Sequence, residues 1–196
     1  MSELLPITVE NIELQHNIVI SSTDYGGERK LLSDVFRKFP ENTDINIVAM
    51  KISLIDLTNS THLSQYKSRI NLYDLSKLIV GISDFDLRLS QGDPEIVNII
   101  AKNTGAINLF SFATKYCTNH NMIVYGRDDY SIFDSVVKTT LPKYKSTLSA
   151  HRIDTWRTTY NYQEFSNCIR DILDEHEIHI PFRRRKFDHF LWYSNK

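Results

Sequence analysis

Apolar side chains recur at intervals of three and four residues along most of this chain, and little interrupts them. From Leu31 to Phe39 they fall on one helical face, and Pro40 ends that run. Only 6 glycines and 5 prolines stand among the 196 residues, which is few for a protein built from many short strands and turns. The pattern is typical of amphipathic helices and predicts a mostly α fold.

Further helices are expected along the chain, and the segment 45–57 is apolar nearly all round, which predicts a buried central helix. The first 27 residues are mixed: Ile18-Val19-Ile20 indicates an early strand that leads into a loop. We therefore expect an N-terminal arm over 1–27 and a single helical domain over 28–196. The other expected helices are 72–79, 93–104 with Asp93 as N-cap, 107–119, a helix from near Ser131, 161–177 and the tail.

Composition excludes several classes of protein. The net charge of -1 carries no global signature of a polyanion binder, so any basic surface must be local. Two cysteines, Cys117 and Cys168, cannot build a disulfide framework or a four-cysteine metal site. No window approaches 18 uninterrupted apolar residues, and acidic residues interrupt the N-terminus. We expect a cytoplasmic protein without a leader or a membrane span.

Two blocks of opposite charge stand near the C-terminus. Residues 164–177 carry a net charge of -4 and residues 181–196 a net charge of +4. One interpretation is a solvated acidic helix paired with a basic tail. The other is that the basic run meets phosphates, with Phe187 and Trp192 fixing the segment to the core. That run is Arg183, Arg184, Arg185 and Lys186.

The window 107–141 holds the most informative pair of side chains. Lys115 lies on the first expected helix and Asp134 in the first turn of the next, 19 residues later. A helix, a loop and a helix start between them would let both side chains face one cleft. The pair also has a purely structural interpretation, because Ser131-x-x-Asp134 is a capping box and Lys115 could be an exposed helix lysine.

These residues resemble the helix-hairpin-helix DNA glycosylases, in particular the 8-oxoguanine glycosylase type. Thr114-Lys115 matches the pair that ends the family's hairpin, and Asp134 and Val137 match its aspartate segment. The family hairpin reads Leu-Pro-Gly-x-Gly, of which only Leu109 is retained. Phenylalanine replaces the proline here, and serine and alanine replace the two glycines that let the hairpin backbone approach a DNA phosphate.

The resemblance implies a compact helical fold and a DNA glycosylase that needs no cofactor and no metal, with or without an AP-lyase step. Lys115 would attack the sugar and Asp134 would stabilise its developing positive charge. The function would be DNA repair or antiviral defence against hypermodified phage bases, performed by a monomer on double-stranded DNA. Candidate walls of a pocket for a flipped base are Phe110, Phe112, Tyr116, Tyr130 and Asp129. Candidate DNA contacts are the polar loop residue Asn59 and the basic run 183–186.

Two other classes of function fit the sequence. A helical DNA-binding or protein-interaction module without catalysis would explain the replaced hairpin glycines. A metal-dependent nuclease could use Asp128, Asp129 and Asp134. Cys117 and His120 have the spacing of half a zinc site, and no second half accompanies them.

Overall fold

The computed structural model describes residues 4–103, 105 and 107–193, and this part of the chain is helical throughout. It holds eleven α-helices and one short 3-10 helix, with no β-strand among the described residues. The prediction of a mostly α fold is therefore confirmed. The α-helices are α1 (Val9–Ser21), α2 (Thr23–Lys38), α3 (Ile45–Thr58), α4 (Leu72–Val80), α5 (Phe85–Ser90), α6 (Glu95–Lys102), α7 (Phe110–Tyr125), α8 (Ser135–Tyr144), α9 (Ala150–Thr158), α10 (Tyr162–Glu175) and α11 (Arg183–Tyr193); the 3-10 helix is η1 (Leu63–Tyr66).

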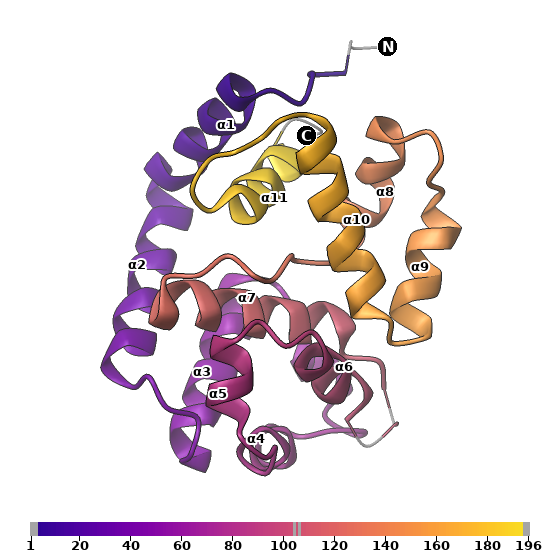
Figure 1. Ribbon diagram of the computed structural model, residues 1–196. Helices are drawn as coiled ribbons and strands as arrows, with labels where there is room; N and C mark the ends of the chain where they lie inside the picture. Colours follow the sequence, from indigo (N-terminus) through magenta and orange to yellow (C-terminus); the bar gives the residue numbers. More distant parts are fainter. Residues whose placement is uncertain (1–3, 104, 106, 194–196) are drawn as a thin grey trace.

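The helices form two groups that meet along α7 and α10 (Figure 1). In the first group, α7 packs against α2, α3, α5 and α6. In the second group, α8 packs against α9 and α11, and α10 packs against α9, α11 and α6. Helix α1 comes first in the chain but packs against α11, the last helix, so the two ends of the described chain lie together.

The N-terminal segment differs from the arm that the sequence predicts. Residues 18–20 belong to helix α1 rather than to a strand, and α2 begins at Thr23 rather than near residue 28. Thr8 caps α1 by accepting a hydrogen bond from the backbone N–H of Asn11 at 3.2 Å. Val19 is buried, and α11 supplies the tertiary packing that outweighs the β propensity of its neighbours. Residues 1–3 of the predicted arm lie outside the described residues.

The most buried helix is α7, whereas the sequence pointed to the segment 45–57. Helix α3 does cover that segment, but only one face is buried, and Leu57 is 77% exposed. Every residue of α7 from Phe112 to Asn121 is buried, polar ones included. Several of the polar side chains bond to groups outside α7; Asn121, for instance, donates to the carbonyl of Leu89, on α5, at 2.9 Å. A hydropathy pattern does not reveal that such a helix is buried, because polar groups that form hydrogen bonds can be buried at little cost in free energy.

Asn42, in the connection between α2 and α3, fixes the position of α7 from one side. Its side-chain oxygen accepts hydrogen bonds from Lys51 Nζ at 3.0 Å and from Tyr116 Oη at 2.6 Å. Its side-chain amide donates to Asp86. Asn42 thereby joins α3, α5 and α7. Three members of this polar network are almost wholly buried and Asp86 is partly exposed, and the network is a rigid support for the helix.

The connection from α7 to α8 also differs from the prediction. Helix α7 continues to Tyr125, six residues beyond the expected end, and Gly126 stops it with a φ of 64°. Helix α8 begins at Ser135, and its N-cap is Asp134 itself. Ser131 therefore is not the cap of a Ser-x-x-Asp box; its backbone N–H donates to Tyr162 Oη at 2.6 Å instead.

Candidate functional site

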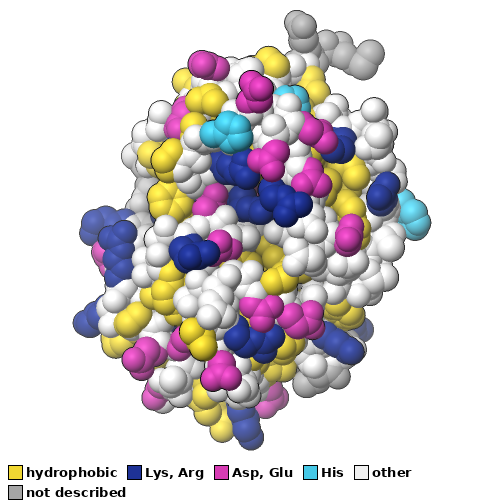
Figure 2. Space-filling model, in the orientation of Figure 1, with side chains coloured by type: hydrophobic (Ala, Val, Ile, Leu, Met, Phe, Trp, Pro, Cys, Tyr) yellow, Lys and Arg dark blue, Asp and Glu magenta, His cyan; other side chains and the backbone are white. Residues whose placement is uncertain are grey.

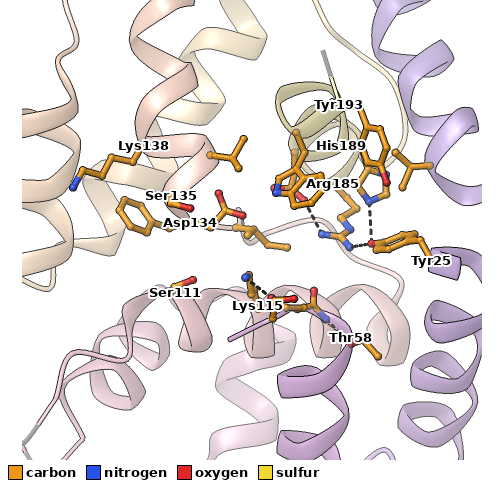
Figure 3. A pocket seen from close by; sticks show the side chains of 18 of the residues that line it. Tyr25, Thr58, Ser111, Lys115, Asp134, Ser135, Lys138, Arg185, His189 and Tyr193 are labelled. Carbon is orange, nitrogen blue, oxygen red and sulfur yellow. Dashed lines mark hydrogen bonds and ion pairs between the residues drawn. The ribbon is translucent and has the colours of Figure 1, made fainter. Parts of the chain in front are cut away.

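A pocket of about 580 Å³ opens between the two groups of helices. Lys115 and Ser111 line it from α7, while Asp134 and Ser135 line it from the start of α8. Figure 3 shows Lys115 on one wall and Asp134 on the wall across from it. The volume lies within the range of about 300–1,000 Å³ that is usual for small-molecule pockets. The structure therefore brings together the two residues that the sequence analysis paired.

One hydrogen bond, between the residue before Lys115 and the residue before Asp134, fixes the relative position of this pair. The backbone N–H of Phe133 donates to the hydroxyl of Thr114 at 3.0 Å. Thr114 precedes Lys115 and Phe133 precedes Asp134, so this buried bond joins α7 to the segment that carries the carboxylate. Phe133 also packs edge-on against Phe110, with ring centroids 5.2 Å apart. The side chains of Lys115 and Asp134 therefore stand on a rigid frame.

Lys115 is a buried lysine, 8% exposed. Its Nζ donates to the backbone carbonyl of Asn59 at 2.7 Å, at the end of α3. Burial lowers the pKa of Lys115 below its ordinary value, and the carboxylates of Asp134 and Asp188 oppose this shift. A larger share of neutral amine makes Lys115 a better nucleophile. Asn59, predicted as a DNA contact, thus holds the lysine through its main chain.

Asp134 serves the fold and the pocket at once. One of its carboxylate oxygens accepts a hydrogen bond from the backbone N–H of Val137 at 2.9 Å, which caps α8. The cap fixes the carboxylate at the pocket wall, where Figure 3 shows it. A carboxylate held in this way can stabilise positive charge that develops in the pocket.

Arg185 and Asp188, two further residues of the wall, form a buried ion pair from α11. Arg185 Nη1 donates to Asp188 at 2.8 Å, and the side chains are 4% and 12% exposed. Burial raises the pKa of Asp188 to about 6, although Arg185 opposes the shift. The sequence analysis placed Arg185 on DNA and did not single out Asp188. Only the (i, i+3) spacing of the two residues could have indicated their pairing.

Tyr25, on α2, also lines the pocket, and sequence reasoning missed it. Its hydroxyl contacts a terminal nitrogen of Arg185 and lies 3.2 Å from Nε2 of His189. Figure 3 shows Tyr25, Arg185 and His189 side by side. These residues are about 160 positions apart in the chain, so no local motif could have joined them.

The opposite rim of the pocket carries a net positive triad. Asp154, on α9, accepts from Lys138 Nζ at 3.0 Å and from Arg157 Nε at 2.8 Å. The hydrogen bond from Arg157 leads the interactions that lower the pKa of Asp154 to about 2. One carboxylate between two cations leaves an excess positive charge at the rim, which would attract an anionic group.

The side chains predicted to wall a base pocket lie elsewhere. Four of them belong to the hydrophobic core, each at most 2% exposed, and none of the five lines the pocket beside Lys115. Phe112 and Tyr116 lie on one face of α7 and Phe110 on another, and all three side chains are buried in the core. The five residues are Phe110, Phe112, Tyr116, Tyr130 and Asp129. Asp129 is ion-paired with Arg127 at 2.6 Å instead.

The basic run 183–186 is engaged within the protein. Arg183 pairs with Asp174, and Lys186 pairs with Glu13 at 2.6 Å. Arg184 donates to the hydroxyl of Ser131 at 2.8 Å, and Arg185 makes the contacts described above. Figure 2 shows basic and acidic side chains interspersed on this face rather than a continuous basic surface. This arrangement agrees with the interpretation of a basic tail paired inside the fold.

The acidic residues considered for a metal have other contacts. Asp128 accepts from the backbone N–H groups of Arg184 and Arg185, at 2.8 and 3.3 Å, and so caps α11. Burial raises the pKa of Asp128 to about 6. Among the described residues, no three side chains of His, Cys, Asp or Glu gather so that they could hold a metal ion. Cys117 and His120 are both buried, and His120 contacts the amide of Asn42.

Comparison with known proteins defines the family of this chain. Residues 10–125 match the family HI_0787_N, described as an N-terminal domain, and the chain belongs to that family. An uncharacterized protein of Haemophilus influenzae is 31% identical over 133 residues, which cover 64% of this chain and 57% of that relative. The chain thus spans little more than half of that relative's length. No solved structure matches the chain.

The matched region ends at Tyr125, inside the pocket-forming part of the fold. Lys115 lies within it, whereas Asp134 and Asp188 lie beyond it. Among the described residues, no helix has both the length and the apolar character that crossing a membrane requires.

Proposed function

We propose that this protein is a DNA glycosylase that excises a damaged or modified base through Lys115 and Asp134. The observation that carries the proposal is a desolvated lysine facing a fixed carboxylate across one pocket. Excision of a base passes through a state with positive charge on the sugar, which calls for a carboxylate close by. A lysine with a lowered pKa supplies the nucleophile.

In the proposed reaction, the lone pair of Lys115 Nζ forms a bond to C1′ of the sugar. The bond between C1′ and the base nitrogen breaks, and its electron pair leaves with the base, which takes up a proton. The C1′–O4′ bond then breaks as the sugar ring opens. One proton of Nζ passes to O4′, and the lone pair left on Nζ forms the C=N bond of a protonated Schiff base that links Lys115 to C1′. Asp134 stabilises the positive charge on the sugar while the glycosidic bond breaks.

The remaining walls suit a flipped nucleotide. Trp192 and Tyr193 supply aromatic surface on which a base can stack. The rim triad of Lys138, Asp154 and Arg157 keeps an excess positive charge that favours a phosphate group. These contacts support the proposal that the DNA backbone binds at the rim beside α8 and α9 rather than at the basic run 183–186.

The proposal is tested by borohydride trapping on a panel of DNAs that includes oxidised, abasic and phage-type modified duplexes, with EDTA present. We expect wild-type protein to form a covalent adduct with at least one DNA, because borohydride reduces the Schiff base to a stable amine. Lys115→Ala should form none. Lys77→Ala, which removes an exposed lysine from α4 away from the pocket, is the matched control and should behave as wild type.

The other outcomes are equally informative. Alkali-labile sites that depend on Asp134 but form no adduct would mean a glycosylase that activates water and does not use Lys115 as nucleophile. Asp134→Asn keeps an oxygen for the cap of α8, so its loss of activity would report on charge rather than folding. Neither signal on any DNA would contradict the proposal and favour a non-catalytic helical module.

A further inference from the structure

A chain of hydrogen bonds leads from the pocket toward the protein surface. It starts at Tyr25, whose hydroxyl lies 3.2 Å from Nε2 of His189. Nδ1 of His189 lies 2.9 Å from Nδ1 of His16, on α1. Tyr25 and His189 line the pocket, while His16 is only half-buried. Three side chains from three helices thus connect the pocket wall with the exterior (Figure 3 shows the first two).

The direction of each hydrogen bond follows from Arg185. A guanidinium group can only donate, so the Tyr25 oxygen accepts from it and directs its own hydrogen to Nε2 of His189. His189 must then carry its hydrogen on Nδ1, which donates to Nδ1 of His16. The hydrogen of His16 is left on Nε2. Every donor in this chain therefore points away from the pocket.

Both imidazoles are held in the neutral form that this pattern requires. Burial, followed by the charge of Arg185, lowers the pKa of His189 well below its ordinary value. Burial also lowers the pKa of His16, to about 4, and Arg29, Lys186 and Arg185 act in the same direction. Among the charged groups that face His16, Glu13 opposes the shift. Each neutral ring has one acceptor and one donor nitrogen, so it can take up a hydrogen on one side and release one on the other.

We propose that Tyr25, His189 and His16 form a path that carries a proton out of the pocket. Tyr25 Oη takes up a proton from a group in the pocket as its own proton moves to His189 Nε2. The Nδ1 proton of His189 moves to Nδ1 of His16, and the Nε2 proton of His16 moves to water. Each group loses one proton and gains one, so the path ends neutral with its hydrogens reversed, and ring flips restore it.

This inference rests on the proposed function, because Lys115 supplies the proton that must leave. The amine passes one proton to O4′ when the Schiff base forms, but the proton that its ammonium form loses to become a nucleophile must leave the pocket. The carbonyl of Asn59 holds Lys115 Nζ but cannot accept that proton. Since Lys115 is almost fully buried, the proton needs a defined route to solvent.

The hydrogen positions are tested directly by ¹⁵N NMR of the histidine rings at pH 7. We expect His189 to carry its hydrogen on Nδ1 and His16 on Nε2, each with one protonated nitrogen. The reverse tautomers, or a charged imidazolium at either position, would overturn the path regardless of any catalytic activity. His179, an exposed histidine outside the chain of bonds, serves as the reference.

The use of the path is tested by single-turnover rates on the DNA that the trapping experiment identifies. His189→Gln and His16→Gln can replace the hydrogen bonds but cannot relay a proton, so each should slow adduct formation at least about tenfold. His179→Gln should be unchanged. Added imidazole should restore the rate of His16→Ala, which a merely structural defect would not allow.

The possible failures are distinguishable. A wild-type protein that forms no adduct on any DNA contradicts the proposed function. The second case is a wild-type protein that reacts while the histidine variants bind the same DNA and react at the wild-type rate. That result overturns the proton path and does not contradict the proposed glycosylase activity. A slow His16→Ala variant that imidazole does not rescue also counts against the path.

Discussion

The positively charged side chain of Lys115 is buried, and the burial of its charge lowers the stability of the fold. A buried ammonium group carries a desolvation cost that a single carbonyl contact offsets only in part. A residue kept at such a cost is commonly a functional one. Removal of the buried charge should therefore affect the stability of the fold and the activity differently at this position.

Replacing Lys115 by methionine tests that conflict. Lys115→Met retains the unbranched side chain and removes the buried charge, so we expect the free energy of unfolding to stay the same or rise by about 1 kcal/mol. Base excision should disappear in the same variant. Urea denaturation followed by circular dichroism measures the first effect. A loss of more than about 2 kcal/mol would show that Lys115 is held mainly for structure.

At the scale of single elements, two glycines with positive φ allow a matched comparison. Gly126 ends α7 with a φ of 64°, and a Cβ placed there would meet open space. Gly92 follows α5 with a φ of 75°, and its Cβ would lie 2.6 Å from the Cβ of Asp129. The first position thus requires glycine for its backbone conformation alone, whereas the second also requires the space.

We expect Gly126→Ala to lower the free energy of unfolding by about 1 kcal/mol, the cost of left-handed backbone for an alanine. Gly92→Ala should lower it by about 3 kcal/mol, because the clash with Asp129 adds to that cost. Thermal melts of the two variants measure the difference. Equal losses would mean that the segment around Asp129 shifts without cost.

Sequence reasoning predicted a helix best where the residues that determine its bounds lie within the helix itself. The apolar pattern and caps indicated α3, α4 and α10 close to their actual bounds, because those signals lie within each helix. The pattern failed for α1, where the packing of α11 outweighs β-branched side chains. For α7 it predicted a helix but ended it six residues early, and it did not indicate its burial, because several of its buried polar residues have partners on segments that no local window contains.

The candidate site follows the same rule. Lys115 and Asp134 could be paired from the sequence because a helix, a connection and a helix start separate them. The other residues that interact with Lys115 come from the end of α3 and from α11, more than fifty residues away on either side, and no sequence spacing could predict them. The aromatic residues beside Lys115 were misassigned to the pocket because proximity in sequence does not tell one face of a helix from another.

At the scale of the whole molecule, buried ionisable groups make stability depend on pH. Burial lowers the pKa of His16, His120 and His189, so acidification below about pH 6.5 protonates them in the unfolded chain first and destabilises the fold. Asp128 and Asp188 act in the opposite sense. Their folded pKa of about 6 lies above the unfolded value, so they take up protons in the folded state between pH 6 and 4.

The two carboxyl groups offset two of the three histidines in that range. We expect a net uptake of about one proton on unfolding, and a stability that falls by about 1.4 kcal/mol per pH unit between pH 5.5 and 4.5. Urea denaturation at pH 7, 5.5 and 4.5 measures this slope. Stability that rises on acidification would contradict the burial of the histidines, and His120→Gln should make the slope shallower.

The cap at the start of α8 has a consequence for relatives of this chain. Asp134 holds the helix with one oxygen, and asparagine offers an equivalent oxygen without the charge. On the proposed function, a relative that extends past the matched region and carries asparagine at this position would fold normally and keep its pocket, yet lack the charge that base excision needs. One side chain would therefore divide active from inactive members, and a survey of natural sequences at this position could sort them before any assay.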